Sequence, residues 1–172
     1  IKGDTEAQGE YQKIITQHRD LLLNCRRNNW LKEQAIWLRL YPCDVKEGSI
    51  EKVLDQIVNL GYNTVYLEVF FDGRVLLPKN SNFTVWPSVV DMPDYGNRDL
   101  YAETLQKARE RGLKTYAWLF SLNYGYLYAQ RGDRTSALAR NGKRENSINF
   151  VNDQSQVFVD PYNSQARQDY TK

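Results

Sequence analysis

A carboxylate and a guanidinium each interrupt an apolar run of this sequence, where ionised groups are least expected. Glu68 lies within the β-branched and aromatic run 64–71, and Arg39 lies within a similar run at 35–41. Such runs are typical of strands buried on both faces of a parallel sheet. An ionised group there is costly unless it is paired, neutralised or used in chemistry. The two residues are therefore interpreted either as an ion pair that fixes packing or as members of a functional site.

The alternation of side chains along these runs groups both charges with aromatic residues. Successive side chains of a strand point to opposite faces. One set is aliphatic and suits packing under helices, whereas the other contains Trp37, Arg39 and Tyr41 in the first run and Tyr66, Glu68 and Phe70 in the second. We expect the charged and aromatic sets to share one face, which in a closed barrel is the lumen. A third run, 114–120, groups Trp118 with Tyr116 and Phe120, but its orientation stays open.

Further polar candidates come directly after the expected strands. Asp72 and Arg74 follow the second run, and Asn123 and Tyr124 follow the third. Asp160 has a similar position after a short apolar stretch at 157–159. Two carboxylates can act as the acid and the nucleophile or base of a glycoside hydrolase. Asp72 and Asp160 are equally suited to forming a turn and capping a helix, so that alternative stays open.

The order of the expected elements indicates how these residues are positioned. The pattern predicts an amphipathic helix over 5–27, then strand 35–41, a helix with Ser49 as its N-cap and Gly61 at its end, and strand 64–71. A helix over 99–111, strand 114–120 and a helix starting at Asn163 or Ser164 follow. This β-α-β-α-β order is typical of a parallel sheet with right-handed crossovers. The long segments after the second and third strands lie where α/β proteins build their sites.

Composition excludes several classes of function. The net charge of +2 and the scattered basic residues argue against nucleic acid, and no stretch is apolar enough for a membrane span. The two cysteines match no metal or disulfide pattern, and no glycine-rich phosphate loop follows the first strand. We therefore expect no metal and no cofactor. Aromatic residues make up 13% of the chain, which suits flat, partly polar ligands such as sugars.

Three phrases of the sequence resemble the opening of glycoside-hydrolase-like family 10, a group of bacterial TIM-barrel proteins. These phrases are Ala35–Leu38, the run 60–66 and the run 111–118, and the stretch 158–167 resembles the family's segment before its fourth strand. The resemblance runs from about residue 33 to the end. It implies the first three or four βα units of a (β/α)8 barrel over 33–172, preceded by a helical extension at 1–32.

The resemblance also implies a function. A protein of this family is expected to hydrolyse O-glycosidic bonds of a polysaccharide or cell-wall glycan in the secreted or cell-envelope compartment. The implied catalytic residues are Glu68 and Asp72, and the implied substrate-binding residues are Arg39, Arg74, Trp118, Asn123, Tyr124 and Asp160.

The resemblance places a further acidic motif after residue 172, so we expect these 172 residues alone to be inactive. The alternative is a non-catalytic glycan-binding or scaffold domain on the same fold. Self-association through an open sheet edge is a third expectation.

Overall fold

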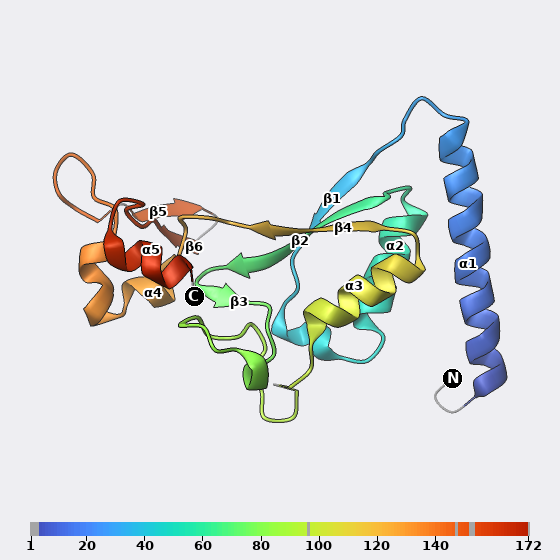
Figure 1. The fold of residues 1–172 in the computed structure, drawn as a ribbon, viewed down its shortest axis with the longest axis horizontal. Coiled ribbons are helices and arrows are strands. Elements are labelled where there is room, and N and C mark those ends of the chain that lie inside the picture. Colours follow the sequence, from blue (N-terminus) through green and yellow to red (C-terminus); the bar gives the residue numbers. More distant parts are fainter. Residues whose placement is uncertain (1–3, 96, 147, 152–153, 172) are drawn as a thin grey trace. The chain divides into compact units, whose positions relative to one another are not determined.

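A computed structural model gives the fold of this chain and describes residues 4–95, 97–146, 148–151 and 154–171. Its main sheet has four strands, which are β1 (Ala35–Leu38), β2 (Thr64–Phe71), β3 (Arg74–Val75) and β4 (Lys114–Leu119). β1 pairs with β2 in parallel, from Ala35 opposite Thr64 to Leu38 opposite Leu67. β4 also pairs with β2 and runs in the same direction (Figure 1). The predicted α/β class with a parallel sheet is therefore confirmed.

The chain divides into two compact units. The first contains Ile1–Leu67 with Tyr101–Ala117, and the second contains Glu68–Leu100 with Trp118–Lys172. The border crosses β2 and β4, so each of these strands begins in the first unit and ends in the second. Each unit has its own packing and is described separately.

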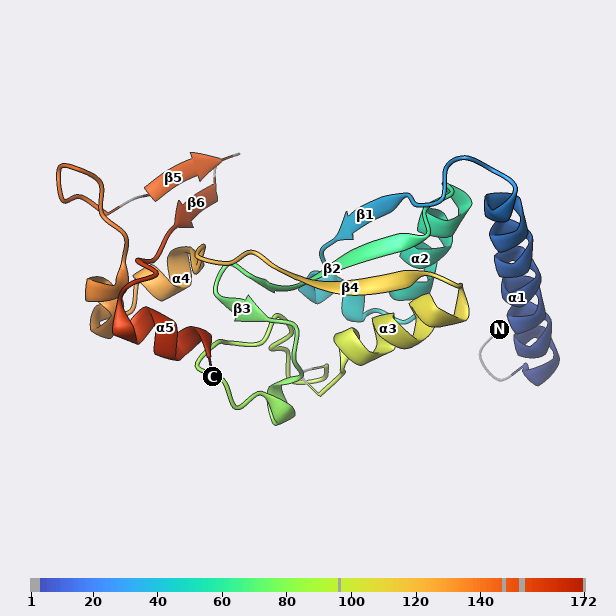
Figure 2. The same cartoon turned by 45° about the horizontal axis from the view of Figure 1, so that its top comes forward.

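In the first unit, helices pack on the aliphatic side of the strands. Helices α2 (Ser49–Asn59) and α3 (Leu100–Glu110) lie side by side, as Figures 1 and 2 show, and Lys107 of α3 pairs with Glu51 of α2. Beneath them, Val65 and Leu67 of β2 are completely buried. This burial of apolar area is the main stabilising contribution to the first unit.

The amphipathic N-terminal helix α1 (Thr5–Arg27) has the predicted bounds. Its N-cap is Asp4, whose carboxylate accepts hydrogen bonds from the backbone N–H groups of Glu6 and Ala7. Tyr11 joins α1 to the rest of the unit, because its hydroxyl accepts from Arg111 at 2.7 Å and donates to Asp55 at 3.3 Å. Arg111 also donates to Asp55 at 2.7 Å. A shared polar cluster therefore holds α1 against α2 and the end of α3.

Two predicted boundaries in the first unit were wrong. β1 ends at Leu38 rather than at residue 41, because its pairing with β2 stops there and a 3₁₀ helix starts at Pro42. Arg39 therefore lies just beyond the strand. The N-cap of α2 is Gly48, with φ of +81°, and Ser49 is the first helical residue. Gly61, with φ of +85°, follows the helix where the sequence placed its end.

Aromatic side chains form a ladder across three neighbouring strands of the first unit. Tyr66 of β2 stacks on Trp37 of β1 with a ring-centroid distance of 5.3 Å, and on Tyr116 of β4 at 5.7 Å. The predicted grouping of Trp37 with Tyr66 on one face is confirmed. The ladder also decides the orientation of β4, since Tyr116 points to the same face as the other two rings.

The second unit starts with the end of β2 and a tight hairpin. Asp72 and Gly73, with φ of +49° and +64°, connect β2 to β3, and Phe71 pairs with Arg74 across the turn. Two positive φ values in a two-residue loop are typical of a type I′ turn, for which Asp-Gly is a preferred sequence. Later elements are α4 (Gly125–Ala129), the antiparallel pair β5 (Ile148–Val151) and β6 (Gln154–Val157), and α5 (Ser164–Tyr170).

The sequence missed most elements of the second unit. The sequence pattern indicates no helix or strand between the third strand and residue 155, yet α4, a 3₁₀ helix at Gly132–Ala137, β5 and the start of β6 lie there. These elements are too short to show a clear hydrophobic period, and they are stabilised by tertiary packing. Their core combines aromatic residues with aliphatic ones and includes Phe70, Trp86, Tyr124, Tyr128 and Val157.

None of the helices in the described part of the chain is long and apolar enough to cross a membrane.

Candidate functional site

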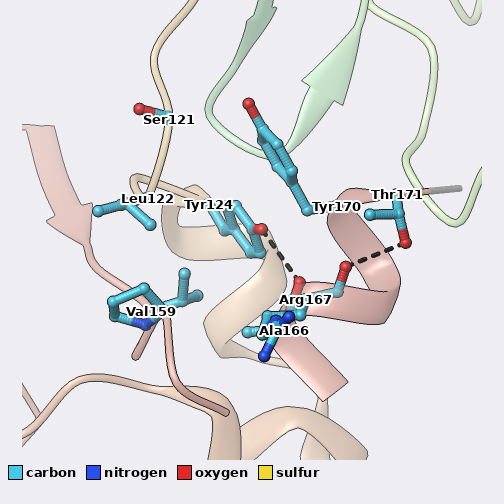
Figure 3. Close-up of a pocket in the computed structure, with 9 residues that line it drawn as sticks. Ser121, Leu122, Tyr124, Val159, Ala166, Arg167, Tyr170 and Thr171 are labelled. Carbon is cyan, nitrogen blue, oxygen red and sulfur yellow. Dashed lines mark hydrogen bonds between the residues drawn. The ribbon is translucent and has the colours of Figure 1, made fainter. Parts of the chain in front are cut away.

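The second unit contains a pocket of about 380 Å³ beside helix α5 (Figure 3). Its walls come from the segment that follows β4, from the segment that precedes α5, and from α5 itself. The lining residues are Ser121, Leu122, Tyr124, Val159, Pro161, Ala166, Arg167, Tyr170 and Thr171. The volume falls within the range of roughly 300–1,000 Å³ that is usual for small-molecule sites. The pocket therefore has the size of a ligand site.

Helix α5 presents two different faces. Ala166, Arg167, Tyr170 and Thr171 are spaced three and four residues apart, so they share the face that lines the pocket. Gln165 and Asp169 are four residues apart and lie on the other face. Asn163 is the N-cap of α5, and its side-chain oxygen accepts hydrogen bonds from the backbone N–H groups of Gln165 and Ala166. The cap sets the position of the whole helix and thereby of the pocket wall.

Tyr124 forms an aromatic wall of the pocket. Its ring is nearly parallel to that of Tyr170, with 5° between the planes and 6.4 Å between the centroids. Its hydroxyl donates to the carbonyl oxygen of Ala166 at 3.1 Å, as the dashed line in Figure 3 shows. Burial, with smaller contributions from Tyr170 and Asp169, raises the pKa of Tyr124 to about 12. Tyr124 is therefore a neutral group at physiological pH.

A buried polar network supports the other face of α5. Asp169 is fully buried and accepts hydrogen bonds from Arg134 at 2.5 and 3.2 Å, from Tyr128 at 3.0 Å and from Gln165 at 2.9 Å. Burial alone would raise the pKa of Asp169, but these hydrogen bonds outweigh it and hold the pKa below its ordinary value. The network fixes α5 against α4 and the 3₁₀ helix at 132–137.

Asn123 and Asp72, two predicted site residues, lie beside the start of α4. Asn123 is buried, and its side-chain oxygen accepts from the backbone N–H groups of Gly125 and Val157. The carboxylate of Asp72 accepts from the backbone N–H of Tyr126 at 3.3 Å. A Cβ atom on Gly125 would collide with Asp72, so the hairpin turn packs directly on this glycine. Both side chains thus hold backbone segments together.

The remaining candidates of the second unit lie outside the pocket lining. Asp160 accepts from the backbone N–H of Tyr162 at 2.9 Å, as in a turn before a helix. Arg74 pairs with Phe71 in the hairpin, and Trp118 stacks on Phe120 at 5.7 Å. Tyr124 is accordingly the only predicted site residue among the described residues that line the pocket.

Glu68 and Arg39 belong to different units. Glu68 is buried in β2, with 3% of its surface exposed, and is the first residue of the second unit. Arg39 is half-buried and belongs to the first unit. Both make interactions within the protein. The Arg39–Glu68 pair therefore stays a prediction, as do the roles of both residues in binding or catalysis.

Sequence reasoning missed the residues of α5 and their partner Arg134. The spacing of Arg167, Tyr170 and Thr171 after the capping Asn163 was the available signal for a shared face. Nothing in the sequence indicated that Arg134 and Asp169 meet. Across the described residues, no group of three or more histidine, cysteine, aspartate or glutamate side chains could hold a metal ion.

Comparison of the chain with protein-family models and with curated proteins found no match in either set.

Proposed function

We propose that this chain is the first part of a (β/α)8 glycoside-hydrolase-like protein and that the pocket beside α5 binds a sugar residue of a glycan. The observation that carries the proposal is the composition of the pocket. The exposed residue Tyr170, whose ring is parallel to that of Tyr124, lines about 380 Å³ together with the polar residues Ser121, Thr171 and Arg167. Sugars have apolar C–H faces and hydroxyl edges, and this combination of rings and polar groups suits both.

The topology supports the barrel part of the proposal. Strands β1, β2 and β4 are neighbours in the order of the sequence, and a helix connects each to the next. This is the repeating unit of a (β/α)8 barrel. The pocket is built from segments that follow β4, and active sites of such barrels lie at the carboxyl ends of the strands.

The proposed reaction is hydrolysis of an O-glycosidic bond, with Glu68 as the first candidate carboxylate. Its burial within an apolar strand supports a specific role, since a buried carboxylate costs free energy that a surface one does not. Asp72 is the second candidate of the proposal. A hydrolase needs two carboxylates on opposite sides of the bond.

A non-catalytic glycan-binding domain is the second candidate function. It is favoured by the engagement of Asp72 and Asp160, since each carboxylate accepts a hydrogen bond from nearby backbone. Release of reducing ends from polysaccharides, measured on the longest protein that contains this chain, separates the two candidates. Loss of hydrolysis with retained binding in Glu68→Gln supports the enzyme, whereas binding without hydrolysis in the unsubstituted protein supports the binding domain.

Sugar binding itself is tested by removing one wall of the pocket. We expect Tyr170→Ala to weaken binding of the best ligand from a glycan array by roughly tenfold, about 1.4 kcal/mol, because the ring contact is lost. Tyr162→Ala is the matched control, since Tyr162 is 90% exposed and lies outside the pocket lining. Equal affinities of both variants and the unsubstituted chain, measured by calorimetry, would exclude this pocket as the sugar site.

A further inference from the structure

One charged side chain stands among the described residues that line the pocket. Arg167 is exposed and reaches the pocket from the same face of α5 as Tyr170 and Thr171. The other lining residues are apolar or neutral and include no carboxylate. The pocket therefore has a positive charge on its wall and no negative charge in its lining.

The guanidinium of Arg167 is available to a ligand. The hydrogen bonds of Arg167 involve its backbone, which donates to Asn163 and accepts from Thr171. Arg134, in contrast, is held by the carboxylates of Asp169 and Asp133. Within the described chain no ion pair engages the side chain of Arg167. An arginine without a carboxylate partner in a ligand-sized pocket is suited to bind an anion.

The acidic residues closest to Arg167 in the sequence have other partners. Asp169 is two positions along the helix, on the opposite face, and its oxygens are occupied by Arg134, Tyr128 and Gln165. Asp160 lies between two lining residues, but its carboxylate accepts from the backbone N–H of Tyr162. The positive charge of the pocket is thus not cancelled by a local ion pair.

We propose that the pocket selects an acidic sugar, with Arg167 binding the carboxylate of a hexuronic acid or another carboxylate-bearing sugar residue. This inference rests on the proposed function and adds the class of the sugar. Arginine binds a carboxylate through two parallel N–H donors, which gives both affinity and orientation. The ring of Tyr170, which is 46% exposed, then contacts the apolar face of the sugar. The hydroxyl of Ser121 faces the hydroxyl groups of the sugar, and the Thr171 oxygen, whose proton is donated to the backbone carbonyl of Arg167, can accept from them.

The test compares matched acidic and neutral oligosaccharides. Oligomers of galacturonic and glucuronic acid are titrated against oligomers of galactose and glucose of equal length, with binding followed by NMR on the full chain. We expect the acidic ligands to bind at least tenfold more tightly at low salt. The preference is expected to shrink as salt is added, because the guanidinium is exposed.

Substitution of the arginine separates charge from shape. Arg167→Gln is expected to remove the preference for acidic sugars, because it weakens binding of acidic ligands at least tenfold more than binding of neutral ones. Arg167→Lys, which keeps the charge but not the planar fork, is expected to retain part of the preference. Arg140→Gln is the control, because Arg140 is an exposed arginine of the same unit outside the pocket.

The outcomes distinguish this inference from the proposed function. Equal binding of acidic and neutral ligands, or a preference that persists in Arg167→Gln, overturns the acidic-sugar inference and leaves sugar binding intact. Binding of neither class by the folded chain overturns both. Should Arg167→Gln unfold, as judged by its NMR dispersion, the salt dependence and the Arg167→Lys variant still decide the role of the charge.

Discussion

The two units of this chain place charges and aromatic rings in opposite ways. In the first unit, Trp37 and Tyr116 are 62% and 50% exposed, and Asp55, the carboxylate that pairs with Arg111, is 40% exposed. In the second unit, Trp86 and Tyr128 are buried, and the carboxylate of Asp169 is fully buried with Arg134. The first unit thus has an aliphatic core and pairs its buried Arg111 with a partly exposed carboxylate, whereas the second unit buries the carboxylate itself beside an aromatic core.

This difference follows from the lengths of the elements. Helices α2 and α3 each have 11 residues; the buried face of α2 is entirely apolar, and that of α3 consists of Leu100, Thr104 and Ala108. Helices α4 and α5 have five and seven residues, and helices of this length are marginal without tertiary support. In the second unit that support comes from buried hydrogen bonds between segments that are distant in the sequence. The comparison predicts that polar substitutions cost more in the second unit.

Removal of the buried carboxylate has the largest expected effect. Asp169→Ala leaves Arg134 and Tyr128 without their shared acceptor, and we expect it to lower the free energy of unfolding by about 3–5 kcal/mol. Urea denaturation followed by circular dichroism measures the change. Asp133→Ala is the matched control, because Asp133 pairs with the same arginine at the surface and should change stability little. Equal losses in both variants would contradict a special role for the buried pair.

A methyl group at Gly125 is the next largest change. Gly125 has φ of +75°, and a Cβ atom there would collide with Asp72 of the hairpin turn. We expect Gly125→Ala to lower the midpoint of urea denaturation by an amount equivalent to about 3 kcal/mol. Gly142→Ala meets no atom within 4 Å and should have no comparable effect. A neutral Gly125→Ala would show that the hairpin and α4 do not pack closely.

Protonation of Asp169 in acid should lower the free energy of unfolding of the second unit. The loss should be smaller than that caused by Asp169→Ala, because a protonated carboxyl can still accept hydrogen bonds. The pKa of Asp169 lies below its ordinary value, since hydrogen bonds outweigh burial. Its contribution to stability is therefore complete above about pH 4 and is lost as the pH falls through the folded-state pKa. The midpoint temperature of thermal unfolding, measured at a series of acidic pH values, should fall less steeply for Asp169→Asn than for the unsubstituted chain. An equal dependence of the midpoint temperature on pH in the two proteins would show that Asp169 is not the group responsible for the acid sensitivity.

The smallest expected effect concerns the polar cluster of the first unit. Asp55→Asn weakens the contact with Arg111 but leaves Arg111 bonded to the hydroxyl of Tyr11 and to the carbonyl of Lys107. We expect a loss of about 1 kcal/mol, because Asp55 is partly exposed. Urea denaturation of Asp55→Asn measures this loss. Asp20→Asn is the control, because Asp20 belongs to an exposed ion pair with Arg19 on α1. A loss as large as that of Asp169→Ala would remove the contrast between the units.

The regular elements were predictable because their signals are local. The α1 bounds, the β2 bounds and the start of α5 at Ser164 agree with the sequence pattern. The strand parity of Trp37 and Tyr66 followed from simple alternation. The end of β1 was missed because strand length depends on pairing with β2, which no single run of residues encodes.

The sequence indicated the segments in which the candidate site lies but not most of the residues that line it. Long segments after β2 and β4 indicated where a site would form, and Tyr124 was among the named residues. Arg167 and Tyr170 were not, since their importance depends on the wall that Tyr124 and the segment around Val159 provide. Residues from three separate segments line this pocket, and their meeting is a property of the packed chain.

The sequence by itself determined the α/β class, the order of α1, α2, α3 and the three parallel strands, and the face of β2 that carries Glu68, because periodicity and capping act over a few residues. Only the tertiary structure decided that Asp169 is enclosed by Arg134 and Tyr128, that Asp72 holds the start of α4, and that α5 turns Arg167 toward a pocket. These arrangements depend on contacts between distant segments, and the free energy of burying a charge depends on the partners that folding brings to it.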